Sequence, residues 1–271
     1  MDMRNTLLAA TLSIMLFAPR ADAGIHLRRS STAGHSSSVS MRKRLHVNDL
    51  IAEPGTAEVD WGTLYSYTTG ALTLPSAIKF TPDGNSLYWG RTEYSVSFDS
   101  ISSGVNTGTR STQFSDRLSF AATSVVYDSE HFDIAVAPQV TTFLRNDSGL
   151  RLGATTIARY DGGGNSIAAT AGWSAATTAS DTNPAGVWDF GGGLAHHMAS
   201  KGTLAKITPH VNLSFEKSTG FEKTLAAFAG VEYQLTERVA FDLSGQRFGV
   251  IGGGQDRQIL LGLTVNLGKM H

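Results

Sequence analysis

Hydrophobic and polar residues alternate one by one along most of the chain from Glu58 onward. The pattern is clearest in residues 206–216, where one parity is apolar and the other is polar or charged. The apolar parity there consists of Ile207, Pro209, Val211, Leu213 and Phe215. Residues 256–268 alternate in the same way. Because successive side chains of a strand point to opposite faces, the pattern predicts strands with one apolar and one polar face.

Segments with this alternation recur about twelve times. They cover residues 58–69, 72–82, 86–99, 115–128, 131–145, 149–161, 165–176, 185–197, 204–217, 221–235, 237–247 and 256–268. Most reach the ~9–11 residues that a tilted strand needs to cross a bilayer, whereas soluble sandwiches usually have shorter strands. The sequence therefore predicts an all-β fold: an antiparallel transmembrane β-barrel of about twelve strands in residues 57–268.

The connections between these segments give a second test. Every second connection is compact: 82–85, 128–130, 161–164, 199–202 and 235–237. Several have Asp-Gly-type turn chemistry. The intervening set includes three longer ones, 100–115, 177–184 and 248–255, and two short ones, 145–149 and 218–220. Bacterial barrels place tight turns on the periplasmic side and longer loops outside, and we expect that arrangement here.

The cost of placing charge in lipid predicts which parity faces inward. A Lys or Arg on the lipid face at the bilayer midplane costs ~2–4 kcal/mol, so the charged parity should line the lumen. The candidate lumen-lining residues are Arg91, Glu93, Arg117, Asp133, Arg145, Arg159, Asp189, Lys206, His210, Glu216, Glu232 and Asp242. Asp60, Lys79, Asp99 and Arg151 share their parity. Positive and negative residues alternate closely on this face, which favours salt bridges in the lumen over strong selectivity for cations or anions.

Aromatic residues fall on the opposite, apolar parity. They are Trp61, Tyr65, Tyr67, Tyr94, Trp173, Trp188 and Tyr233. We expect them to form the aromatic girdles of a membrane barrel. The alternative is that they are core aromatics of a soluble sandwich.

The first 23 residues are typical of a secretory signal peptide. Arg4 lies in a short polar region, an apolar run follows from Leu7 to Phe17, and Ala21-Asp22-Ala23 offers a small-x-small cleavage site. The apolar run is too short for a membrane-spanning helix, which needs ~20 residues. We therefore expect export through a cleaved signal peptide to the outer membrane of a Gram-negative-type bacterium.

Residues 24–56 form a polar, basic N-terminal segment that we expect to be flexible. Residues 24–52 carry five basic residues and one acidic residue, a net charge of +4, whereas residues 53–271 carry 15 basic and 20 acidic residues, a net charge of −5. The Ser-rich run 35–40 can bury little apolar area. The segment is either a solvated periplasmic linker or a plug that folds back into the lumen. Nucleic-acid binding is disfavoured because no aromatic residues are interleaved with the basic ones.

No motif for catalysis, metal or cofactor binding emerges. The chain has no cysteine, so it lacks a lipid-anchor thiol, disulfides and Cys-based metal sites. His196 and His197 are neighbours on a predicted strand and should point to opposite faces. The enzymatic alternative is an outer-membrane lipid esterase, for which Ser124 and His196 are the outward candidates, although they come from distant strands. We expect a protein that is not an enzyme, with no catalytic residue, metal or cofactor.

Three segments resemble a known family. They are Gly90-Arg91-Thr92-Glu93 before a strand, the run 132–139, and the run 230–236. The chain resembles the outer-membrane barrels of the MetA pathway of phenol degradation, a transporter-like family, over most of residues 57–268. The resemblance implies passage of small, often aromatic or hydrophobic, compounds across the outer membrane. Barrels commonly end in an aromatic residue that the assembly machinery recognises, whereas this chain ends in Met270-His271.

The function that these observations favour is a transporter or channel for small solutes. The expected partners are outer-membrane lipid, the assembly machinery and a small-molecule solute, and no nucleic acid. A different possibility is a structural or adhesive barrel with a closed lumen that binds through its outer loops, of which 100–115 is the long candidate. The lipid esterase is a minor alternative.

Overall fold

The computed structural model describes residues 51–52, 54–83, 91–106, 109–113, 117–144, 149–179, 184–198, 202–251 and 255–269. The predictions about the signal peptide and about nearly all of the basic segment fall outside these ranges. Within them, no helix is both long enough and apolar enough to cross a membrane.

The described residues form thirteen strands and one short helix. They are β1 (Thr56–Ser66), β2 (Leu72–Thr81), β3 (Thr92–Asn106), β4 (Thr109–Gln113), β5 (Arg117–Asp128), β6 (Phe132–Phe143), β7 (Leu150–Gly162), β8 (Asn165–Ala176), β9 (Gly186–His196), the 3-10 helix η1 (Thr203–Lys206), β10 (Ile207–Ser218), β11 (Lys223–Thr236), β12 (Val239–Val250) and β13 (Gln255–Lys269). All strand pairs are antiparallel.

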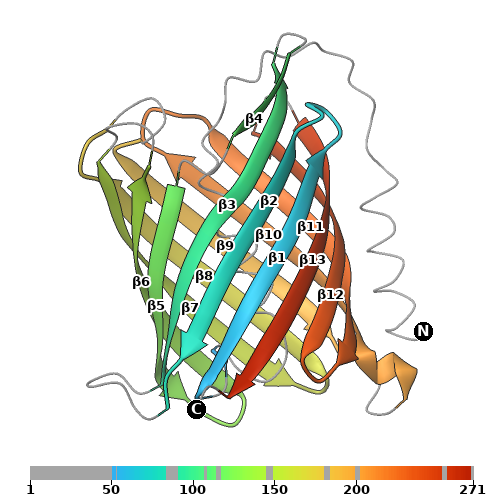
Figure 1. Cartoon of the computed structure of the whole chain (residues 1–271). Coiled ribbons are helices and arrows are strands. Elements are labelled where there is room, and N and C mark those ends of the chain that lie inside the picture. The colour runs from blue at the N-terminus through green and yellow to red at the C-terminus, as the bar shows by residue number, and fades with distance from the viewer. Residues whose placement is uncertain are drawn as a thin grey trace.

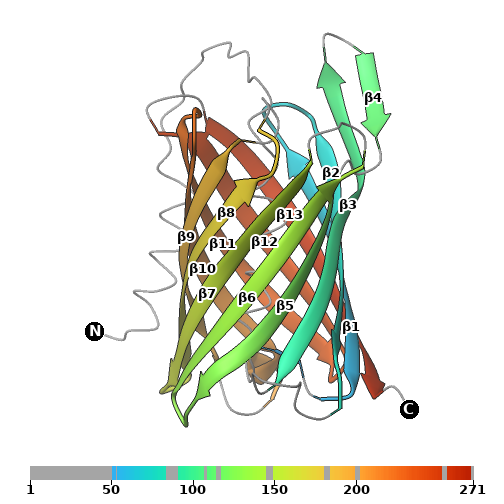
Figure 2. The ribbon, with the colours of Figure 1, turned by 90° about the vertical axis from the view of Figure 1, so that its left-hand side faces the viewer.

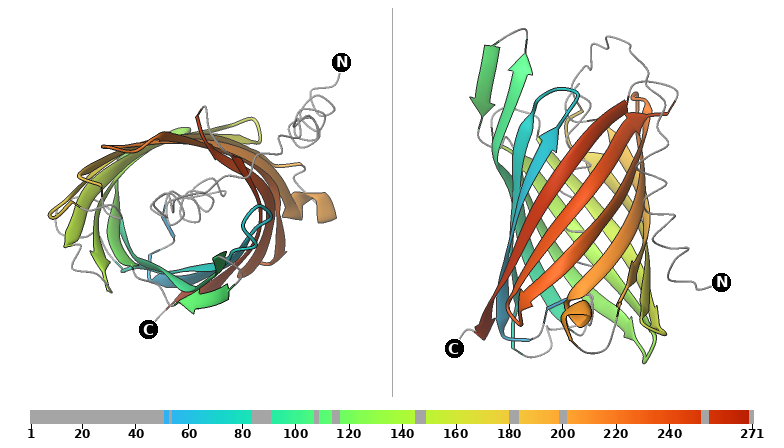
Figure 3. Two further views of the ribbon diagram at one scale, coloured as in Figure 1. Left: turned by 90° about the horizontal axis from the view of Figure 1, so that it is seen from above. Right: turned by 90° about the vertical axis from the view of Figure 1, so that its right-hand side faces the viewer.

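Twelve strands close into a single barrel (Figures 1 and 3). Each pairs with its neighbours along the chain, β2 pairs with β3, β3 pairs with β5, and β1 pairs with β13 to complete the ring. The β1–β13 pairing joins Thr56 to Lys269 and Ser66 to Gln258. The prediction of an antiparallel barrel of about twelve strands is confirmed.

One strand, β4, lies outside the ring. The first part of β3 pairs with β5, whereas its last part, Ser102–Asn106, pairs with β4. The β3–β4 hairpin therefore projects beyond the barrel rim (Figure 2). We expected residues 100–115 to be a loop, and this expectation was wrong for most of them. The segment contains five β-branched residues, Ile101, Val105, Thr107, Thr109 and Thr112, which favour extended structure, so the chain continues as a hairpin.

Two other expected boundaries also differ. The strand expected from residue 204 begins at Ile207, because residues 203–206 form η1. The strand expected to end at 247 continues to Val250, which shortens the following connection. The turn between β7 and β8 agrees with expectation: Gly163 and Gly164 have φ of 60° and 78°, as a two-residue hairpin turn with two positive φ angles requires.

The ring has two distinct ends. β1 starts and β13 ends at the same end, together with the turns 129–131, 163–164 and 237–238. We call this the terminal end. The β3–β4 hairpin lies at the opposite end, which we call the hairpin end (Figure 2).

Buried and exposed residues alternate along the strands. Most of the large apolar side chains are on the exposed face, which is the reverse of a soluble protein. On β8 the buried residues are Ser166, Ala168, Thr170, Gly172 and Ser174, and every residue between them is exposed. Large apolar side chains elsewhere are also exposed, for example Leu213 with 59% of its surface accessible. A belt of exposed apolar residues around a ring of strands is the arrangement that lipid requires.

Candidate functional site: the enclosed face of the barrel

Charged side chains pair on the enclosed face. Lys79 Nζ on β2 lies 2.9 Å from Asp60 Oδ2 on β1, and each side chain has 4% of its surface exposed. The other oxygen of Asp60 accepts a hydrogen bond of 2.8 Å from Thr264 Oγ1 on β13. Three strands are thus linked across the point where the barrel closes. Burying these charges is tolerable because they are paired and hydrogen-bonded.

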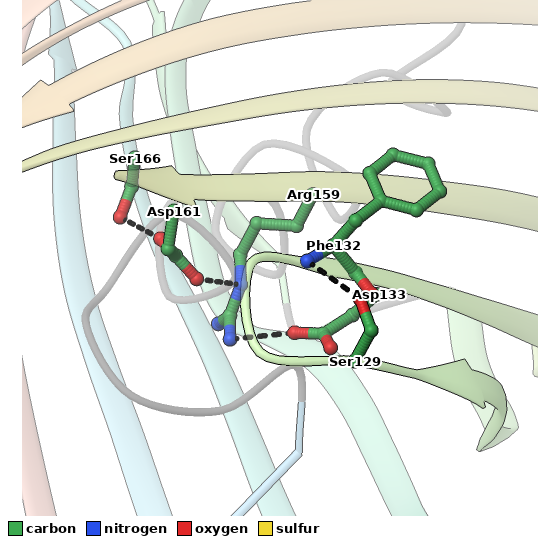
Figure 4. A network of polar contacts seen from close by, with 6 residues as sticks. All are labelled: Ser129, Phe132, Asp133, Arg159, Asp161 and Ser166. Carbon is green, nitrogen blue, oxygen red and sulfur yellow. Dashed lines mark hydrogen bonds and ion pairs between the residues drawn. The ribbon is translucent and has the colours of Figure 1, made fainter. Parts of the chain in front are cut away.

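A second group surrounds Arg159 on β7 (Figure 4). Its Nη2 lies 2.9 Å from Asp133 Oδ2 on β6, and its Nε lies 2.7 Å from Asp161 Oδ2. Ser166 on β8 donates a short hydrogen bond to Asp161. One guanidinium therefore holds two carboxylates on adjacent strands, close to the terminal end.

His210 and Asp242 form a third group across an intervening strand. His210 Nε2 on β10 lies 3.3 Å from Asp242 Oδ2 on β12, an ion pair when the imidazole is protonated. β11 passes between them and presents Gly230 opposite both His210 and Ser244. A Cβ atom on Gly230 would lie 2.8 Å from His210 Nε2 and 2.4 Å from Ser244 Cβ. Glycine therefore leaves the space through which the imidazole reaches β12.

Glu93 on β3 connects the enclosed face to the chain that precedes β1. It is buried, and its Oε2 accepts a 3.0 Å hydrogen bond from the backbone N–H of Ala52. Ile51, beside Ala52, has only 2% of its surface exposed. Ile51 and Ala52 therefore lie within the barrel's terminal end.

A further charged group lies toward the hairpin end. Arg151 donates hydrogen bonds to Ser174 Oγ at 3.1 Å and to the carbonyl oxygen of Pro184 at 2.6 Å. Glu216 interacts electrostatically with Arg151, with Arg117 and with Asp189. The Asp189 carboxylate lies over Gly172 on β8, where a Cβ atom would come within 2.4 Å of it.

On the described strands β7 and β10, the charged groups form two layers with a band of uncharged residues between them. On β7, Gly153, Thr155 and Ile157 separate Arg151 from Arg159 on the enclosed face. On β10, Asn212 and Ser214 separate His210 from Glu216. At ~3.3 Å per residue and a tilt of about 40°, the layers lie roughly 15–20 Å apart along the barrel axis. Small residues form part of the wall of the band, including Ala135 and Ala137 on β6 and Gly191 and Gly193 on β9.

The predicted lumen-lining residues fall into clear groups. Glu93, Arg159 and His210 are buried. Those of intermediate burial are Arg91, Arg117, Asp133, Asp189, Glu216, Glu232 and Asp242. Arg145 lies outside the described residues. Lys206 needs correction: it is exposed at the end of η1, and its Nζ approaches the carbonyl oxygen of Leu235 at 3.4 Å, because the strand expected from residue 204 begins only at Ile207.

Other polar residues of the enclosed face were not singled out from the sequence. Glu58 and Asp256 are buried, and Asp256 accepts hydrogen bonds from Ser66 Oγ at 2.9 Å and Gln258 Nε2 at 2.7 Å. Both lie two residues from another polar residue of the same face. Parity alone could therefore have identified them.

Aromatic residues on the exposed face form two bands. Near the hairpin end, Trp173 and Trp188 lie 6.3 Å apart between ring centroids, and the contacts continue to Phe190 and Phe215. Near the terminal end, Tyr127 contacts Phe132 at 6.2 Å. Such bands are typical of the two interfaces of a membrane.

The esterase candidates do not come together. Ser124 on β5 contacts Thr92 Oγ1 at 2.8 Å, and His196 on β9 contacts Asn165 Oδ1 at 2.9 Å. Three strands separate them in the ring, which is about 19 Å at ~4.8 Å per strand. In the described part of the chain, no three His, Asp or Glu residues are placed to hold a metal ion.

Comparisons with known proteins agree with this architecture. No protein-family model matches the sequence, and no curated protein matches it. The fold, however, is that of outer-membrane porins and channels. An outer-membrane channel from Pseudomonas putida F1 is similar with a TM-score of 0.61 at 8% identity, over 82% of this chain and 99% of that one.

Two porin structures give the same result for the fold. The NanC porin matches with a TM-score of 0.53 at 8% identity, over 76% of this chain and 98% of that one. The KdgM porin matches with a TM-score of 0.51 at 9% identity, over 77% of this chain and 98% of that one. At such identities the likeness establishes the fold, and the resemblance to the phenol-degradation family stays a prediction.

Proposed function

We propose that this chain is an outer-membrane channel for small solutes. The observation that carries the proposal is the inversion of burial around a closed ring: polar and charged residues are enclosed, and apolar residues face outward. A closed ring with a polar interior offers a path for solutes, and its apolar exterior matches lipid. The candidate residues that the structure encloses, among them Glu93, Arg159 and His210, would line that path.

The passage should be narrow. Barrels of about eight strands are filled by their side chains, and those of about sixteen enclose an aqueous channel, so twelve strands predict a size-limited lumen. The charged layers would narrow it further, because the long side chains of Arg151, Glu216 and Arg159 and the pair Lys79–Asp60 are on the enclosed face. Since both signs occur in each layer, weak selectivity for ion charge is expected.

Three finer elements of the proposal rest on sequence alone. Residues 1–23 would direct export and be removed, and the barrel would be inserted by the outer-membrane assembly machinery into the lipid of that membrane. The class of solute, small aromatic or hydrophobic compounds, follows from the family resemblance. No residue is assigned a catalytic role.

Reconstitution into planar bilayers and liposomes tests the channel. We expect single-channel conductance and liposome swelling that falls steeply with solute size. The double variant Arg151→Ala/Glu216→Ala should raise conductance because it removes two long side chains from one layer. Leu213→Ala on the exposed face is the matched control and should leave conductance unchanged. A folded protein that neither conducts nor swells liposomes would contradict the proposal.

The β3–β4 hairpin favours a second candidate function, an adhesive barrel. It projects beyond the rim, as a partner-binding element would (Figure 2). Replacing residues 100–113 with a short turn separates the two functions. A closed adhesive scaffold would lose cell-surface binding and show no permeation before or after the change, whereas a channel would keep its permeation.

A further inference from the structure

Four basic residues gather on the exposed face near the hairpin end. They are Lys217, Lys223, Arg247 and Arg257, which we call the basic rim patch. Their chain neighbours Ser218, Thr224, Gln246 and Gln258 are buried on the enclosed face. Because side chains alternate along a strand, the four cations face outward, toward the membrane surface.

The sheet register brings these cations together as two like-charged pairs. Lys217 on β10 is directly opposite Lys223 on β11, and Arg247 on β12 is directly opposite Arg257 on β13. Like charges at directly opposed positions destabilise a sheet. Among the described residues, no carboxylate forms an ion pair with any of the four, and Arg247 Nε donates a 2.7 Å hydrogen bond to the neutral Gln255.

Both pairs lie close to the hairpin end of the barrel. Lys223 bonds through its backbone to Ile251, four residues along β12 from Arg247, which is ~13 Å along the strand at ~3.3 Å per residue. At a tilt of about 40° this offset is ~10 Å along the barrel axis and ~8 Å around the ring, and all four residues lie within three residues of the end of their strand at the hairpin end. The two pairs thus sit near one another at the rim.

Aromatic residues place this rim at a membrane interface. Lys217 is directly opposite Trp188, and the backbone N–H of Tyr67 donates a 2.8 Å hydrogen bond to the carbonyl oxygen of Arg257. Tyr67 also contacts Tyr65 at 5.2 Å, edge to face. Exposed Trp and Tyr mark the headgroup level of a bilayer. The cations therefore lie where lipid headgroups are found.

In this sector of the rim the outward-facing charged residues of the strands are cations, and the exposed acid among the described residues there is Glu222, in the β10–β11 connection. At the terminal end, exposed acids and bases are mixed: Asp128, Glu130, Glu237, Lys206 and Arg238. Near the hairpin end of β7 to β9, the outward residues are apolar and include Leu150, Leu152 and Trp173. Cations thus concentrate on one sector of one rim, which is the pattern of a binding site for an anion.

We propose that the basic rim patch binds the phosphate groups of a phosphorylated glycolipid in the outer leaflet. In bacterial barrels the longer connections face outward, so the hairpin end lies in that leaflet. A phosphate monoester carries about −1.5 to −2 charges at pH 7, which one pair of cations neutralises. The two arginines can contact phosphate through two parallel hydrogen bonds. This site does not depend on whether the lumen conducts.

Binding to the purified full-length protein in neutral detergent tests the proposal. The probes are a bis-phosphorylated glucosamine disaccharide lipid, its dephosphorylated form and inorganic phosphate, followed by native mass spectrometry and by the unfolding temperature. We expect the phosphorylated lipid to bind at least about tenfold more tightly than the other two. Each pair variant, Lys217→Gln/Lys223→Gln or Arg247→Gln/Arg257→Gln, should weaken that binding by about tenfold or more, since each cation near an anionic surface contributes ~1 kcal/mol.

The matched control is Lys206→Gln/Arg238→Gln, which removes two exposed cations at the terminal end and should not change lipid binding. Equal binding of phosphorylated and dephosphorylated lipid by the unaltered protein would overturn the proposal. So would pair variants that remain folded on an unheated gel and bind as tightly as the unaltered protein. Equal affinity for inorganic phosphate would overturn the assignment to a lipid.

Discussion

Lys79 and Asp60 form an ion pair of 2.9 Å beside the seam where β1 meets β13, with each side chain 4% exposed. Removing Lys79 leaves the buried Asp60 carboxylate without its ion-pair partner. We expect Lys79→Met to lower the free energy of unfolding by about 3–5 kcal/mol. The double variant Lys79→Met/Asp60→Leu should recover much of the loss. Unfolding in denaturant measures both, with the exposed Lys206→Met as control.

The close packing around Gly230 predicts that a larger residue there destabilises the barrel. We expect Gly230→Ala to destabilise the barrel by about 1–3 kcal/mol, because the new methyl group overlaps the His210 imidazole and the Ser244 side chain. Gly192→Ala is the matched control, since a Cβ atom there meets its nearest neighbour at 3.6 Å. Equal loss of stability for the two variants, measured by the temperature at which the folded band disappears on a gel, would contradict this account.

Lipid exposure can be tested at neighbouring residues with opposite orientation. Leu213 is exposed on the outer face, and Ser214 follows it on the enclosed face. Leu213→Lys should cost ~2–4 kcal/mol in a bilayer, because it places a charge in hydrocarbon near the middle of a strand. Ser214→Lys should cost less. Unfolding titrations in lipid vesicles measure the difference, and a larger cost at Ser214 would reverse the assigned orientation.

Arg159 gives a prediction about ion selectivity. Arg159→Gln leaves Asp133 and Asp161 without their shared cation and should raise the permeability of cations relative to anions. Glu216→Gln removes a negative charge from the other layer and should shift the ratio the opposite way. Reversal potentials in a salt gradient measure both shifts. Shifts in the same direction for the two variants would show that these layers do not control permeation.

Much of the fold could be predicted because the alternation of apolar and polar residues is visible within each segment of the sequence. The alternation in 206–216 and 256–268 predicted strands that the structure contains as β10 and β13. The misplacement of Lys206 and of the hairpin at 100–113 has a physical cause. The exact start of a strand, and how far it extends past the rim, depend on pairing with another strand, which no single segment specifies.

The sequence predicted which face of its strand each candidate residue occupies, but not which residue it contacts. Parity placed Glu93, Arg159 and His210 on one face, and the structure encloses all three. It did not indicate that His210 reaches Asp242 across Gly230, or that Ala52 binds Glu93. These contacts depend on register between strands.

The sequence by itself determined the class of fold, because period-two alternation and the cost of charge in lipid act residue by residue. Only the tertiary structure decided that β1 closes on β13, that Lys79 meets Asp60, and that four cations on β10 to β13 form one patch. Closure joins residues about 200 positions apart in the chain, as in the bond of Thr264 to Asp60. The register and tilt of the whole ring set which side chains share a height, and these are collective properties of all twelve strands.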